Sequence, residues 1–138
     1  MGTNFYIKLK GREKPVHIGK SSAGWAFNLH YIPGICENLD HWKDYINNKD
    51  NVIYNEYMQK VSPEELIDTI TMRGYKGDTD GSFEAWDQKL TTEDVRAFER
   101  ENHARYDVTT GLMRHTDLNF TVATPEGETY DLIEGDFC

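Results

Sequence analysis

Apolar and polar residues alternate along the first third of the chain, which is the pattern of half-buried β-strands. Residues 5–9 and 16–18 alternate on either side of a turn-forming cluster at 11–15. The alternation is clearest at 24–32, where every second residue from Trp25 onward is large and apolar. The same pattern, with a hairpin turn before the last segment, predicts six strands at residues 5–9, 16–18, 24–32, 52–54, 120–124 and 129–133.

Three other segments have apolar residues at helical spacing behind a residue that caps helices well. Asn38 precedes the first, which we expect to run to about residue 48. The second begins with Ser-Pro-Glu-Glu, in which Ser62 and Glu65 form a capping box, and Gly74 is expected to end it. Thr91 precedes the third segment. The pattern therefore predicts three helices.

The order of these elements predicts the fold class. Early strands, interspersed helices and a late hairpin are typical of an α+β fold, with an antiparallel sheet and about three helices packed on one face. The chain has 138 residues, a usual size for one hydrophobic core, so we expect a single domain over residues 1–138.

The charge narrows the classes of partner. The chain has 24 acidic and 15 basic residues and a formal net charge of −9. A field of this sign repels phosphates, so we expect no direct binding of nucleic acid, whereas a basic protein is a suitable partner. The alternative is that the acidity only keeps the protein soluble. No apolar run is long enough to cross a membrane, and the start lacks the apolar segment of a signal peptide. We therefore expect no membrane contact and a cytoplasmic location.

Gly19-Lys20-Ser21 matches the end of a phosphate-binding P-loop. The full motif needs a glycine five residues earlier, where this chain has Lys14, and a helix afterwards, where a strand is expected. A base and a nucleophile are also present in His17, Lys20 and Ser21, but no third group at a recognisable spacing orients them. The segment His17–Trp25 is thus either a small-ligand or catalytic site, or a serine-rich hairpin turn.

An acidic segment in the middle of the chain is a candidate contact surface. Its first residues resemble a calcium-binding loop, but the sixth position is Phe83 instead of glycine and the twelfth is Lys89 instead of glutamate. A tryptophan surrounded by carboxylates suits a basic partner, or alternatively packs into the core beneath a solvated loop. The residues of this predicted partner-binding site are Asp78, Asp80, Glu84, Trp86 and Asp87.

Metal ligands are sparse in the sequence. His30, Cys36 and His41 fall within twelve residues, near a predicted strand end and helix start. No Cys-x-x-Cys pair exists, which excludes a standard zinc ribbon or finger. We predict no cofactor, and a zinc site around these three residues is the alternative left open.

Two stretches of this chain resemble a family of small proteins from bacteriophages and prophages. They are the opening Met1–Tyr6 and the run His17–Trp25, accompanied by the Ser-Pro-Glu-Glu helix start and an acidic final strand at Tyr130–Phe137. Some members of that family have a Cys-x-x-Cys pair before the His-Ile-Gly residues, where this chain has residues 11–15 instead.

The resemblance implies a phage accessory protein. Acidic proteins of this kind include anti-CRISPR proteins, which inhibit bacterial immunity. We therefore expect an inhibitor that works in the host cytoplasm, has no catalytic activity and binds a nucleic-acid-binding effector such as Cas9 through an acidic surface. Two alternatives stay open: a small-ligand protein, metal-binding protein or enzyme using His17–Trp25, and a phage structural or assembly protein.

Overall fold

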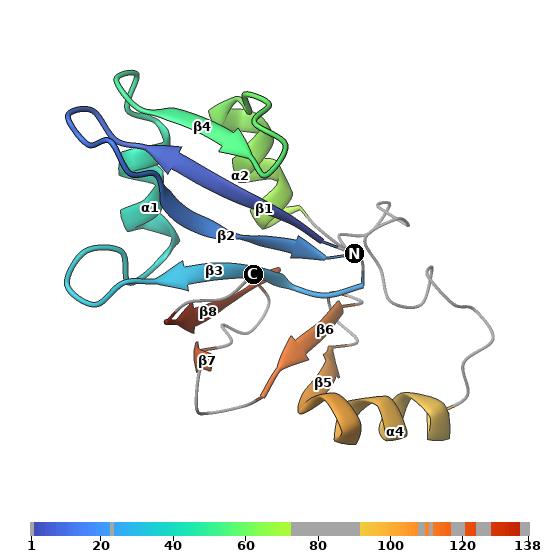
Figure 1. Ribbon diagram of the computed structural model, residues 1–138. Helices are drawn as coiled ribbons and strands as arrows, with labels where there is room; N and C mark the ends of the chain where they lie inside the picture. The colour runs from blue at the N-terminus through green and yellow to red at the C-terminus, as the bar shows by residue number, and fades with distance from the viewer. Residues whose placement is uncertain are drawn as a thin grey trace.

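A six-stranded sheet with the order β4-β1-β2-β3-β8-β7 forms the main layer of the computed structural model (Figure 1). The structure describes residues 2–22, 24–72, 92–107, 110, 112–116, 121–123 and 128–135. The strands of this main sheet are β1 (Gly2–Lys8), β2 (Val16–Ser22), β3 (Phe27–Tyr31), β4 (Val52–Asn55), β7 (Thr121–Ala123) and β8 (Tyr130–Glu134). They correspond in number and order to the six predicted strands.

Four of the five strand pairs in the main sheet are antiparallel, and the pair of β3 and β8 is parallel. Their register runs from Phe27 opposite Tyr130 to Tyr31 opposite Glu134. β7 pairs antiparallel with β8, which confirms the hairpin predicted from the sequence. β2 is longer than predicted, because residues 19–22 pair with β1 and belong to the strand. These residues are therefore not a hairpin turn.

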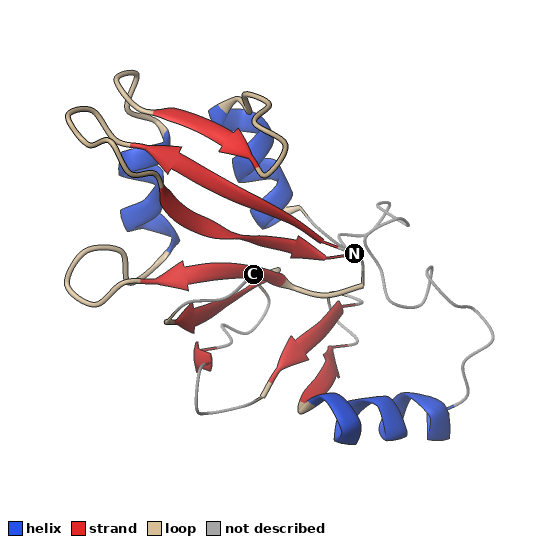
Figure 2. Cartoon of the chain, in the orientation of Figure 1, coloured by secondary structure: helices blue, strands red, loops and turns tan. Residues whose placement is uncertain are grey.

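Two helices, α1 (Leu39–Ile46) and α2 (Pro63–Thr71), cover one face of the main sheet (Figure 2). Asn38 and Ser62 cap them as predicted, since each side chain accepts a hydrogen bond from an amide in the first turn. Their apolar faces meet the strand side chains in one core. Its fully buried members include Ile7, Ile18, Phe27, Leu29, Trp42, Ile46, Leu66 and Ile70.

The third helix, α4 (Thr92–Asn102), belongs to a separate part of the fold (Figure 1). It packs beside a two-stranded sheet of β5 (Ala104–Asp107) and β6 (Leu112–His115), which the sequence pattern did not predict. Val95 and Phe98 of α4 contact a small apolar cluster built on Ala104, Met113 and Trp25. The helix takes this position because its short apolar stripe matches that cluster.

The α+β class is confirmed, with three helices and eight strands among the described residues. The described part of the chain contains no helix that is both long enough and apolar enough to span a membrane.

Candidate functional site

The segment His17–Trp25 places its first residues on the face of the main sheet opposite α1 and α2. His17 Nε2 lies 2.8 Å from Asn4 Oδ1, and its ring lies against those of Tyr6 and His30, with centroids 5.2 and 5.7 Å away. His30 Nδ1 lies 3.0 Å from the backbone oxygen of His17, so this nitrogen carries the proton and donates. We call Asn4, Tyr6, His17 and His30 the open-face cluster.

The remaining residues of that segment separate in space. Lys20 pairs with Asn4 across the strands and shares the face of the open-face cluster. Ser21 follows Lys20 in the same strand, so its side chain points to the other face. His17, Lys20 and Ser21 therefore do not form a base and nucleophile pair.

Trp25 lies in the second apolar cluster. Its ring stacks on His115 with centroids 4.7 Å apart and meets Phe98 at 5.9 Å. Burial is the main reason that the pKa of His115 is lowered, so its imidazole is neutral at pH 7. Trp25 thus joins α4 and the two-stranded sheet to the end of β2.

The three predicted metal ligands occupy different environments. His30 belongs to the open-face cluster, whereas the Nδ1 atom of His41 accepts a hydrogen bond from the backbone amide of Glu37 at 3.0 Å. Cys36 is 2% exposed within the core, and burial raises the pKa of its thiol to about 11, so the thiolate that zinc prefers is disfavoured. Among the described residues, no three His, Cys, Asp or Glu side chains are arranged to hold a metal ion.

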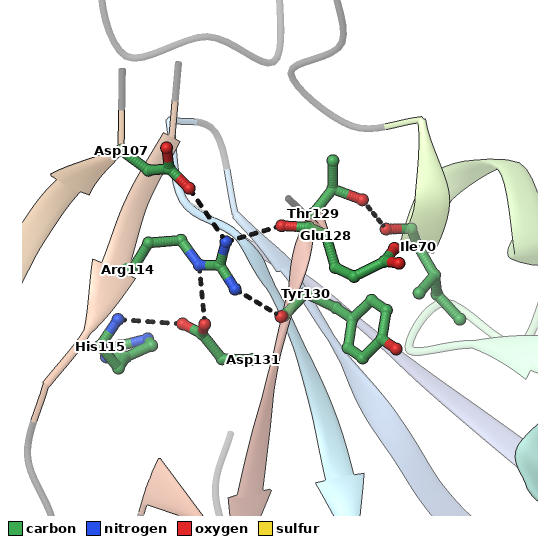
Figure 3. A network of polar contacts seen from close by, with 8 residues as sticks. All are labelled: Ile70, Asp107, Arg114, His115, Glu128, Thr129, Tyr130 and Asp131. Atoms are coloured by element: carbon green, nitrogen blue, oxygen red, sulfur yellow. Dashed lines mark hydrogen bonds and ion pairs between the residues drawn. The ribbon is translucent and has the colours of Figure 1, made fainter. Parts of the chain in front are cut away.

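A buried arginine connects the two sheets (Figure 3). Arg114 of β6 is 1% exposed, and its Nε donates to Asp131 of β8 at 2.8 Å. Its Nη1 lies 3.3 Å from a carboxylate oxygen of Asp107 and donates to the Glu128 carbonyl at 2.6 Å. Its Nη2 donates to the Tyr130 carbonyl at 2.8 Å. The guanidinium thus joins β5, β6 and β8.

Asp131 is the most enclosed member of this network. It is 0% exposed, and its second oxygen accepts the backbone amide of His115 at 2.9 Å. Burial raises the pKa of Asp131, while the Arg114 charge and these hydrogen bonds favour the ionised form and offset part of that shift. Nearby, the Thr129 hydroxyl donates to the Ile70 carbonyl of α2. The sequence alone does not indicate this network, because its partners lie on strands that are distant in sequence.

The solvent side of α1 and α2 is acidic. Asp40 and Asp44 of α1 and Glu64, Glu65 and Asp68 of α2 are all exposed, and none forms an ion pair within the described residues. These two helices contain one cation, Lys43, at a half-buried position. We call the five carboxylates the acidic helix surface. Three of them stand in first turns, where they also stabilise the helix ends.

The predicted partner-binding residues Asp78, Asp80, Glu84, Trp86 and Asp87 lie outside the described residues. The acidic helix surface was not singled out from the sequence, although the helical spacing of its carboxylates opposite Leu66 and Ile70 contained the information.

Comparisons of the chain with protein-family models, curated proteins and solved structures found no match.

Proposed function

We propose that this protein is a stoichiometric inhibitor that binds a basic protein partner through the acidic helix surface. The observation that carries the proposal is the set of five exposed carboxylates on α1 and α2, against a single lysine. Both helices are anchored by fully buried residues such as Trp42 and Leu66. The carboxylates therefore stand on a rigid support and lose little freedom on binding.

The electrostatics favour a partner that holds nucleic acid. Clusters of Lys and Arg that bind phosphates create a positive electrostatic potential. A fixed array of carboxylates competes with the phosphates for these clusters. The net charge of −9 adds long-range attraction to such a surface. This charge pattern is the support for the proposed binding function.

The finer proposal concerns the identity of the partner. The opening residues and the run His17–Trp25 resemble a phage protein family, and phage accessory proteins include inhibitors of CRISPR–Cas immunity. We propose a Cas effector as the partner, with Cas9 as the leading candidate. The site of action would then be the host cytoplasm.

Phage challenge tests this proposal. Bacterial strains that each carry one CRISPR–Cas system are infected with a targeted phage, with and without the protein. Restored plaquing against one system identifies the effector, whose purified complex with guide RNA is then titrated with the protein. We expect tight binding that weakens as salt rises, because exposed charges are screened. No rescue in any system refutes the Cas target.

A charge-matched pair of variants tests the surface. The first replaces Asp44, Glu64 and Asp68 of the acidic helix surface by their amides. The control replaces Glu93, Glu101 and Glu134, which are exposed on α4 and at the end of β8. Both variants remove three negative charges from the total of −9. Any effect of net charge alone on binding is therefore equal in the two variants. We expect only the first variant to lose binding, and equal losses would contradict a localised surface.

The open-face cluster supports a second candidate, a small polar ligand bound on the face of the sheet opposite α1 and α2. Its two imidazoles and the Asn4 amide gather near Lys20, which is a suitable set of groups for a polar or anionic molecule. A His17→Gln/His30→Gln variant separates the two candidates. Lost rescue with an unchanged melting temperature favours the cluster, whereas full rescue excludes it from the function.

A further inference from the structure

The turn that follows β4 exposes two large apolar side chains next to one another. Tyr57 is 67% exposed and Met58 is 76% exposed, the two highest values among the large hydrophobic residues described as exposed. Neither side chain belongs to the two apolar clusters of the fold. Their exposure therefore has no explanation in the packing of the described residues.

The turn itself is held by a dense set of hydrogen bonds centred on Asn55. Its backbone amide donates to the Gln59 carbonyl at 3.0 Å, and its carbonyl accepts from the Met58 amide at 3.0 Å. Its side-chain oxygen accepts the amides of Tyr57 and Gln59 at 2.9 and 3.1 Å. The backbone beneath Tyr57 and Met58 is thus fixed, so ordering the turn adds little cost when a partner binds.

Met58 occupies a backbone conformation that suits glycine. Its φ is +63°, in the left-handed region, which costs a residue with a Cβ about 1 kcal/mol. Turns of this form normally place glycine at the left-handed position. Met58 is a large, exposed side chain at a position where the backbone favours glycine. This combination indicates that the side chain contacts something outside the fold.

Acidic residues flank this pair in the sequence, and the carboxylate of Glu56 accepts the Asn4 amide at 2.9 Å. Glu56 is exposed in the same turn, and Glu64 and Glu65 are exposed in the first turn of α2, which follows directly. Between residues 52 and 72, Lys60 is the one cation. The turn is therefore an apolar segment that leads along the chain into the acidic first turn of α2.

We infer that Tyr57 and Met58 are the anchor of the binding surface, and that they insert into an apolar pocket rimmed by Lys and Arg on a protein partner. This inference rests on the proposed function and names the residues that supply most of its affinity. Tyr and Met are enriched in the buried centre of interfaces. Exposed acidic groups at the rim favour a partner whose pocket is surrounded by basic residues. An anionic membrane is disfavoured as the occupant, because its surface repels these carboxylates.

The test compares three variants for binding to the Cas effector complex identified by phage challenge. Tyr57→Ala and Met58→Gly should each weaken binding by about tenfold or more, as truncated anchor residues do. Met72→Ala is the matched control, since Met72 is 50% exposed at the end of α2, and it should change binding less than about twofold. Met58→Gly should also raise the melting temperature, because it relieves the left-handed strain.

A gain in stability together with a loss in binding distinguishes an anchor from a structural turn. If the effector binds Tyr57→Ala and Met58→Gly as tightly as the wild type, the anchor inference is overturned while the proposed function stands. If Met72→Ala loses as much affinity as they do, the anchor inference is overturned as well.

If no Cas effector binds the wild type, the Cas target fails and a photo-crosslinking amino acid at position 57 tests the anchor in host cells. A crosslinked basic protein that, once purified, binds the wild type about tenfold tighter than Met58→Gly supports the inference. Absence of an adduct, or a crosslink to a second copy of the chain, overturns it. Binding of the protein to phosphatidylglycerol vesicles that depends on Tyr57 also overturns it.

Discussion

Replacing Arg114 by Met removes the charge that connects the two sheets while keeping a long apolar side chain. In the wild type the guanidinium contacts two carboxylates and two backbone carbonyls with 1% of its surface exposed. The variant leaves Asp131, which is 0% exposed, without its cation. Asp107 and both carbonyls lose this hydrogen bond from the guanidinium at the same time.

Breaking a buried ion pair by removing one partner costs about 3–5 kcal/mol, because the remaining charge is uncompensated. A domain of this size has a total stability of about 5–15 kcal/mol, so Arg114→Met should lose a large part of it. The loss should shrink as pH falls towards 4. Without the guanidinium, the folded-state pKa of Asp131 rises further above its unfolded value, so ionisation opposes folding at neutral pH and protonation removes the penalty.

Urea denaturation followed by circular dichroism at pH 7 and pH 4 measures both effects. Arg105→Met is the matched control, because Arg105 is exposed on β5 directly opposite Arg114. It should change the free energy of unfolding by less than about 0.5 kcal/mol. A loss below about 1 kcal/mol for Arg114→Met, or an equal loss in the control, would refute the structural role of the network.

Further predictions concern the main sheet, its helices and the core between them. Ser62→Ala should cost about 1 kcal/mol of unfolding free energy in urea titrations, because the Ser62 hydroxyl accepts a first-turn amide at 3.1 Å. Gly19→Ala should abolish cooperative thermal unfolding, since a Cβ at this position overlaps the Phe27 ring and a neighbouring backbone oxygen. In a Cys138→Ser background, the buried Cys36 thiol should react with Ellman's reagent far more slowly in the native protein than in urea. Because its folded pKa of about 11 exceeds the ordinary value of 9.0, its contribution to stability should be constant below pH 9 and fall between pH 9 and 11.

Each of these has an outcome that contradicts it. An unchanged urea midpoint for Ser62→Ala would mean that the cap contributes nothing to α2. A cooperative transition for Gly19→Ala at the wild-type temperature would mean that β2 and β3 separate easily. Equal thiol reactivity with and without urea would place Cys36 outside the core.

Local sequence information accounted for most of the main layer. The caps at Asn38 and Ser62 and the buried faces of their helices depend on residues within one or two turns, so spacing alone predicts them. The strand alternation likewise predicted all six members of the main sheet. Position 19 shows the limit of this approach. In the sequence, Gly19-Lys20-Ser21 resembled the end of a P-loop, whereas in the fold the glycine lies in β2 and is required for close packing against Phe27.

The features that depend on distant residues were missed. β5 and β6 are four residues each and show no distinctive alternation, so they become evident only through their pairing. Arg114 is an ordinary polar residue in the sequence, and nothing local indicates that Asp131 comes from another sheet to meet it. The candidate binding surface also depends on distant residues, because α1 and α2 come to the same side of the sheet only when both pack on the core.

The parallel pair of β3 and β8 has a consequence for the time course of folding. β3 ends at Tyr31 and β8 begins at Tyr130, so the contact closes a loop of about a hundred residues, and such distant contacts slow folding. During synthesis β1, β2, β3 and β4 leave the ribosome early, while one edge of β3 waits unpaired for β8. We expect the main sheet to be completed only after β8 has been released, and until then the open edge of β3 is the site most exposed to aggregation.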